Sequence, residues 1–256
     1  MTTPEVTTIK RAGSRFYVHP TTGAKAPGVT SVVGCLPKPG LGYWRGRTVA
    51  EEAVENLSTV VDLVTKGNPT AAIDFLKRAP DRSSGAAAKL GSEVHAIVET
   101  INRGEDPGPL HPDFGPWVAR YRDFLEKWQP EFLEVEATVW SHAHTFAGTL
   151  DGIVRLDGEV LVWDLKTGKS GAWPEVALQL NGYANADVIV DAAGVERPMP
   201  EIEGAAVLTL RPDSYELIPV RLGPDVFEVF RHLLGVLAWE TEVAKTVLGA
   251  AVDAPK

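Results

Sequence analysis

The feature that most constrains the fold of this chain is the pair Asp157-Gly158. It separates two strand-like runs, TFAGTLDGIVRL at 145–156 and EVLVWDL at 159–165. An Asp-Gly pair between apolar runs is the strongest short-range indication of a two-residue β-hairpin. The sequence therefore predicts two antiparallel strands joined by a type I′ turn.

The register of that hairpin brings charged residues together. If Leu156 faces Glu159 across the turn, the same register places Asp151 opposite Asp164. Alternation along the second strand puts Lys166 on the face that carries Asp164. We therefore expect two carboxylates and one ammonium group on a single patch of a sheet.

Two opposed carboxylates need something that offsets their repulsion. Directly opposed Cβ atoms lie about 4.5–5.5 Å apart, and like charges there destabilise a sheet. The hairpin is apolar on both faces, so it is expected to be buried. A divalent cation with oxygen ligands, Mg²⁺ or Mn²⁺, would bridge the pair. The alternative is that Asp164 only pairs with Lys166 where the strand emerges, while Asp151 is solvated.

Composition limits the kind of metal site. Cys35 is the single cysteine, which excludes an internal disulfide and a cluster held by four thiolates. Any metal must therefore be held by oxygen and imidazole ligands. Apolar runs of the roughly 20 residues that a membrane helix needs do not occur, so no membrane role is expected.

The order of predicted elements indicates a mixed α/β fold. Residues 1–85 are expected to form an irregular N-terminal elaboration. Residues 86–256 are expected to form a core, in the order helix, helix, three strands, helix, strand, strand, helix. The third of these helices is predicted over 174–190, and the last, over about 224–247, carries an apolar stripe that suits a core or a subunit contact.

Four motifs occur in succession within this core: GSEVHAIVE, GTLDGI, WDLKTGK and QLNGY. Their order resembles that of the RecB-type branch of the PD-(D/E)XK nucleases, which includes phage exonucleases and CRISPR-adaptation nucleases. The similarity is specific over about residues 91–183. It implies a restriction-endonuclease-like core, with a mixed sheet flanked by helices, and Mg²⁺-dependent hydrolysis of DNA. Members with an iron–sulfur cluster use four cysteines, so no such cluster is expected here.

The resemblance assigns roles by position. It places His95, Asp151, Asp164 and the backbone carbonyl of Leu165 as metal ligands. It makes Lys166 the residue that positions or helps deprotonate the attacking water and stabilises the charged transition state.

Three further residues are supporting candidates. Gln179 and Tyr183 lie four apart on one helix face, where they support the site or touch DNA; Glu99, four residues after His95, is a candidate member of the site. The alternatives are that His95 is a satisfied core histidine and that Gln179 and Tyr183 form only a structural pair. His142 and His144 share a strand face and are rival candidates for a metal, but they lie outside the family pattern and are expected to be solvated near a turn.

Charge is distributed unevenly along the chain. The net charge is −9, but residues 1–50 hold seven lysine and arginine residues and one glutamate, which leaves −15 on the remainder. Within this basic segment, Lys38, Arg45 and Arg47 surround Trp44. They are candidates for phosphate contact and base stacking, although a packed tryptophan and solvated cations fit the sequence equally well.

The function expected from the resemblance is that of an exonuclease or DNA end-processing enzyme of phage or recombination type. The alternatives are a site-specific endonuclease or junction resolvase, and an inactive DNA-binding protein on the same fold. DNA is the expected partner, together with a single-strand annealing or recombination protein. The expected location is the cytoplasm, that of the host if a phage encodes the chain. Polarity, strand preference, the number of metal ions and oligomeric state stay open.

Overall fold

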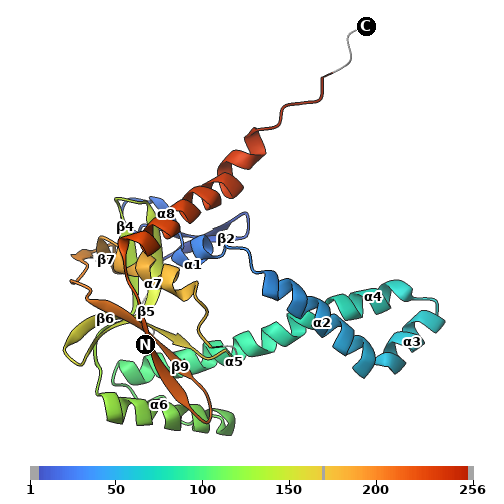
Figure 1. The fold of residues 1–256 in the computed structure, drawn as a ribbon, viewed down its shortest axis with the longest axis horizontal. Helices are drawn as coiled ribbons and strands as arrows, with labels where there is room; N and C mark the ends of the chain where they lie inside the picture. The colour runs from blue at the N-terminus through green and yellow to red at the C-terminus, as the bar shows by residue number, and fades with distance from the viewer. Residues whose placement is uncertain (1–5, 169–170, 253–256) are drawn as a thin grey trace. The chain divides into compact units, whose positions relative to one another are not determined.

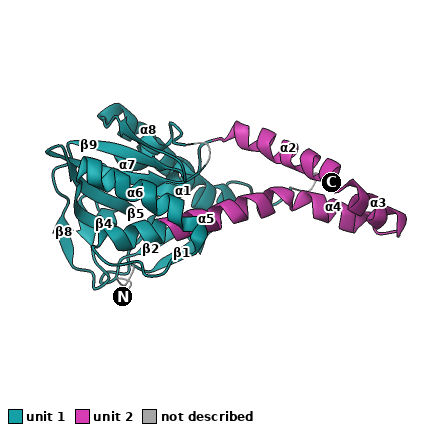
Figure 2. Ribbon diagram, turned by 90° about the horizontal axis from the view of Figure 1, so that it is seen from below, with its two compact units in different colours: residues 1–36, 95–256 teal, residues 37–94 magenta. Residues whose placement is uncertain are grey.

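The computed structural model describes residues 6–168 and 171–252, which fall into two compact units (Figure 2). The first unit lies within residues 1–36 and 95–256, and the second comprises residues 37–94. The boundary falls inside helix α5 (Ala79–Asn102) rather than at residue 85, where the sequence suggested it. Within the described ranges, no helix has an apolar stretch long enough to cross a membrane.

The first unit is built on a seven-stranded sheet in the order β10-β9-β6-β5-β4-β7-β8. Neighbouring strands are antiparallel except β6 and β9, which are parallel. The sheet is therefore mixed, and the expected mixed α/β layout is confirmed. Its strands are β4 (Glu131–Ser141), β5 (Phe146–Leu156), β6 (Glu159–Lys166), β7 (Val188–Val190), β8 (Glu196–Pro198), β9 (Gly204–Leu210) and β10 (Tyr215–Val220).

Helices cover both faces of this sheet (Figure 1). Helices α1 (Val29–Val33), α7 (Val176–Ala184) and α8 (Pro224–Ala238) pack together on the face that carries Val162. On the opposite face, Trp163 stacks on Phe124 of α6 (Gly115–Trp128), with ring centroids 5.7 Å apart. Alternation along β6 thus gives each helical layer its own apolar contacts.

Shorter elements complete the first unit. A separate three-stranded sheet contains β1 (Thr8–Arg11), β2 (Ser14–Val18) and β3 (Lys25–Pro27). The one-turn helix η1 (Pro112–Phe114) precedes α6, while η2 (Trp239–Val243) and η3 (Ala244–Thr246) follow α8.

The β5–β6 hairpin has the predicted register. Leu156 pairs with Glu159 and Gly152 pairs with Trp163. The two turn residues both have positive φ, 50° at Asp157 and 89° at Gly158, as a type I′ turn requires. The paired residues end at Gly152 and Trp163, and the same register continued by one residue sets Asp151 opposite Asp164.

Two local expectations were wrong. The helix predicted over 174–190 ends at Ala184, and Val188–Val190 forms β7, because these β-branched residues pair with Thr138–Trp140 of β4. The N-terminal region is not an irregular elaboration up to residue 85. Residues 6–36 pack with the core unit, and the segment that follows is helical.

The second unit is helical. It contains α2 (Pro39–Glu55), α3 (Leu57–Thr65), α4 (Pro69–Lys77) and the first part of α5. Proline at the first turn of α2 and α4 suits their starts, and the Asn68 side chain accepts a hydrogen bond from the backbone N–H of Ala71. Ala72 is the one buried residue that α2, α3 and α4 contribute among the residues described.

The apolar stripe near the C-terminus packs inward. Phe230 and Leu237 are buried in the main core, and Val226, Phe227 and Leu234 pack against it. The sequence allowed this stripe to be part of the core or a subunit contact, and it is part of the core.

Close packing behind β5 gives a stability prediction. A Cβ at Gly148 would lie 2.6 Å from a ring carbon of Tyr183, so Gly148→Ala should lower the free energy of unfolding by about 1–3 kcal/mol in urea denaturation. The control is Gly235→Ala in α8, where a Cβ meets nothing within 4 Å; it should be neutral or stabilising by up to about 1 kcal/mol. Equal effects of the two substitutions would show that the Gly148–Tyr183 contact imposes no steric limit.

Candidate metal centre

Asp151 lies at the centre of the cluster of charged groups on β5 and β6. Its Oδ2 accepts a hydrogen bond of 2.7 Å from the backbone N–H of Leu165. The same oxygen lies 3.7 Å from Nδ1 of His95, which α5 supplies. The side chain is 22% exposed, so it is accessible at the edge of the cluster.

Asp164 is 2% exposed and is contacted from two elements. Lys166 Nζ lies 2.9 Å from Oδ1 and 2.7 Å from Oδ2, and Gln179 of α7 donates to Oδ1 at 3.0 Å. The Oδ2 contact with Lys166 is an ion pair without hydrogen-bond alignment. Oδ2 therefore accepts no hydrogen bond from the described residues. A buried carboxylate oxygen of this kind is suited to a cation.

The two aspartates disfavour each other's ionisation. Burial, followed by the charge of Asp151, raises the pKa of Asp164 to about 6, against the opposing effect of Lys166. Burial also raises the pKa of Asp151, although the Leu165 N–H and the Lys166 charge act in the other direction. The patch therefore stores electrostatic repulsion that a bound cation would relieve.

His95 is held as a neutral imidazole. Desolvation lowers its pKa more than the Asp164 charge raises it. The Lys166 charge also lowers the pKa, while a polar contact with the Leu165 backbone raises it. This contact places His95 beside the carbonyl named as a ligand from the sequence. Neutral imidazole is the form that binds metals.

Glu136 joins this cluster, and the sequence reasoning missed it. Donor atoms of His95, Glu136 and Asp151 all lie within 4.8 Å of one another. Glu136 lies between Val135 and Ala137, whose partners Gly152 and Leu150 flank Asp151. Its φ is 50°, a left-handed conformation that is uncommon for a residue with a side chain and is concentrated at functional sites. The sequence signal that could have identified Glu136 is the turn SHAHT at 141–145. If Ser141 pairs with Phe146 across that turn, the same register sets Glu136 opposite Asp151.

The supporting residues divide into two groups. Gln179 contacts Asp164 and, at 3.5 Å, the hydroxyl of Tyr183. Tyr183 is 2% exposed, so it supports Gln179 from behind and is not a surface for DNA. Glu99 pairs instead with Arg103 at 2.9 Å.

The basic residues predicted to contact DNA lie in the second unit. Arg45 pairs with Asp81 at 2.8 Å and Arg47 with Glu51 at 2.6 Å, while Lys38 is exposed at the start of α2. Trp44 is half-buried, and the adjacent Tyr43 is 83% exposed. A role for these residues in binding DNA remains a prediction.

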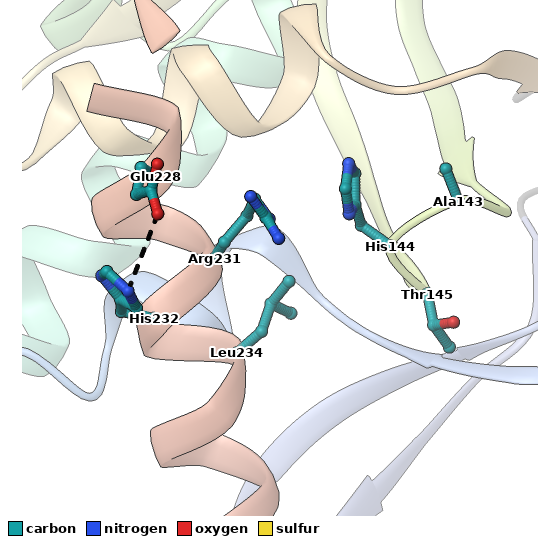
Figure 3. Close-up of a pocket in the computed structure, with 7 residues that line it drawn as sticks. All are labelled: Ala143, His144, Thr145, Glu228, Arg231, His232 and Leu234. Carbon is teal, nitrogen blue, oxygen red and sulfur yellow. Dashed lines mark ion pairs between the residues drawn. The ribbon is translucent and has the colours of Figure 1, made fainter. Parts of the chain in front are cut away.

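The rival histidines do not converge. His142 Nε2 lies 3.0 Å from Glu196 Oε1, which also contacts His19 Nε2 at 2.8 Å. His144 lies at a hollow of about 350 Å³ between the β4–β5 turn and α8, lined also by Arg231 and His232 (Figure 3). None of the predicted ligands lines this hollow.

A metal titration tests the role of Glu136. Glu136→Gln should weaken Mn²⁺ binding by about tenfold or more in isothermal calorimetry, because a charged candidate ligand is lost. Glu134→Gln is the matched control on the same strand. Glu134 pairs with Arg197 at 2.7 Å, so its replacement should leave Mn²⁺ affinity unchanged. Equal affinities in both variants would remove Glu136 from the site.

The raised pKa of Asp164 predicts a pH dependence of stability. In EDTA, the free energy of unfolding should fall as pH rises from about 4 to about 6, because native Asp164 holds its proton more tightly than the unfolded chain does. The free energy of unfolding of Asp164→Asn should decrease less over this pH range, because asparagine does not titrate. The measurement is urea denaturation of both proteins over that pH range, and parallel profiles would contradict the assignment.

Comparisons with known proteins assign neither a family nor a function to this chain. Neither protein-family models nor curated protein sequences give a significant match to this chain. A solved structure titled "Crystal structure of SSO0001" is similar at 15% sequence identity, covers 75% of this chain and 84% of that chain, and has a TM-score of 0.36. A TM-score of this size does not establish a shared fold.

Proposed function

We propose that this protein is a metal-dependent DNA nuclease with a PD-(D/E)XK core. The observation that carries the proposal is the convergence of Asp151, Asp164, His95 and Lys166 at one edge of the β5–β6 hairpin. A buried Asp164 and a half-buried Asp151, both with raised pKa, are costly to assemble beside a neutral histidine and a lysine. Such clusters are concentrated at functional sites.

The donor set fits Mg²⁺ or Mn²⁺. Asp151, Asp164, Glu136 and the Leu165 carbonyl offer oxygen, and His95 offers an imidazole nitrogen. Oδ2 of Asp164, which is paired with Lys166 but accepts no hydrogen bond from the described residues, supports the same conclusion. A bound divalent ion would neutralise charge that develops on a phosphodiester and make water a better nucleophile.

The chain's own groups have separate tasks. Lys166 holds an ammonium group next to Asp164, where it can orient the attacking water and stabilise negative charge on phosphate oxygens. Gln179 fixes the Asp164 carboxylate through Oδ1. Tyr183, which is on the same helix α7, contacts Gln179 and packs tightly against Gly148 of β5. This packing keeps Gln179 in place.

Within this proposal, an exonuclease or end-processing enzyme of phage or recombination type remains the leading form. The rival forms are a site-specific endonuclease or junction resolvase, and an inactive DNA-binding protein. An inactive relative is expected to lack a ligand or the lysine, and this chain keeps all of them. A single-strand annealing or recombination protein as partner, and a cytoplasmic location, are part of the same proposal.

Two substitutions separate metal binding from chemistry. Asp164→Ala should abolish both DNA cleavage and Mn²⁺ binding, because it removes a ligand. Lys166→Ala should keep Mn²⁺ binding and lose about a hundredfold or more in cleavage rate, because it removes charge and water placement only. Calorimetry and a gel assay with Mg²⁺ measure the two effects.

The same assay tests the function itself. Linear and covalently closed circular DNA, single- and double-stranded, are incubated with the protein in Mg²⁺ or EDTA. Loss of the linear forms alone in Mg²⁺ would identify an exonuclease. Normal turnover by Asp164→Ala, with melting curves showing a folded protein, would refute the proposed site.

A further inference from the structure

Arg211 lies next to the candidate metal centre but belongs to none of its motifs. It follows β9, which runs parallel to β6 with Thr209 paired to Lys166. Both strands therefore end at the same edge of the sheet. Arg211 Nη1 donates to the carbonyl of Leu210 at 2.8 Å and to the carbonyl of Lys166 at 3.4 Å. The guanidinium is thus held beside Lys166 by backbone groups.

Within the described residues, Arg211 has no carboxylate partner. Three other arginines in or next to strands of the seven-stranded sheet are paired: Arg155 with Glu131 at 3.0 Å, Arg197 with Glu134 at 2.7 Å, and Arg221 with Asp225 at 2.8 Å. Arg211 is only partly exposed, and its Nη2 and Nε make no hydrogen bond to the described residues. A half-buried guanidinium with unused donors in a chain of net charge −9 is suited to an external anion.

The charge of the neighbouring site explains why such a group is needed. Glu136, Asp151 and Asp164 would repel a phosphodiester, and the Lys166 ammonium is already paired with Asp164 at 2.7 Å. A guanidinium that no carboxylate of the described residues neutralises offers attraction at that edge. Its planar pair of donors also matches two phosphate oxygens.

We propose that Arg211 binds a backbone phosphate of the DNA substrate beside the phosphodiester that is cut. This inference rests on the proposed nuclease function and adds a substrate-binding residue to it. The two backbone carbonyls hold the guanidinium in position before DNA binds, so less side-chain freedom is lost on binding.

The test measures DNA binding and cleavage separately. Arg211→Gln keeps a donor for the Lys166 carbonyl but removes the charge, and Arg211→Lys keeps the charge but not the planar pair of donors. Arg155→Ala is the matched control, since Arg155 of β5 is exposed, is paired with Glu131 of β4, and lies across from Val160, near the start of β6 and away from Lys166. Fluorescence anisotropy with a labelled oligonucleotide in Ca²⁺ is recorded over a salt series, and kcat and KM are measured in Mg²⁺. Competition by inorganic phosphate shows whether free phosphate is bound instead of DNA.

Arg211→Gln should weaken DNA binding by about tenfold to hundredfold and flatten the slope of log affinity against log salt by about 0.7–0.9. Mn²⁺ affinity and melting temperature should match those of the wild type, and Arg211→Lys should recover most of the salt slope. If the wild type is active but Arg211→Gln binds DNA with unchanged affinity and salt slope, the inference is overturned and the nuclease function is not. Inorganic phosphate that displaces DNA equally well from the wild type and from Arg211→Gln would also overturn the inference. A wild type that binds DNA through Arg211 but never cuts it would overturn the nuclease function and leave the phosphate contact in place.

Discussion

The repulsion between Asp151 and Asp164 is the constraint on which the rest of the site depends. The type I′ turn at Asp157-Gly158 fixes the register, and that register, continued one residue past the Gly152–Trp163 pair, sets the two carboxylates opposite each other. The surrounding groups each offset part of the cost. The Leu165 N–H bonds to Asp151, while Lys166 and Gln179 hold Asp164. Burial, followed by the charge of Asp151, still raises the pKa of Asp164 despite these contacts, so its ionised form stays disfavoured.

The scaffold around the pair is rigid because it is densely packed. Gly148 leaves room for the Tyr183 ring, and Tyr183 in turn contacts Gln179. Another glycine, Gly182, lets the ring of Phe230 approach α7, which locks the helix against α8. A site built on strands and packed helices in this way can hold charged groups in fixed positions.

The central pair of this site could be predicted from the sequence because it depends on local rules. One turn dipeptide and the two-residue period of a strand gave the register up to Gly152 and Trp163, next to Asp151 and Asp164, and the face that Lys166 shares with Asp164. Glu136 was missed because its placement depends on the register across a longer turn and on an unusual backbone conformation. Arg211 was missed because a parallel pairing between β6 and β9 brings it to the site across 45 residues. The strand β7 was assigned to a helix for a similar reason, since its pairing with β4 overrides the local pattern.

The most direct test of this account is anomalous diffraction from crystals grown with Mn²⁺. The account predicts a strong peak enclosed by the carboxylates of Asp151 and Asp164 and the imidazole of His95, and no peak there in crystals of Asp164→Ala. The absence of a peak at this position at saturating Mn²⁺, with both aspartates ordered, would contradict the claim that the facing carboxylates form a divalent metal site.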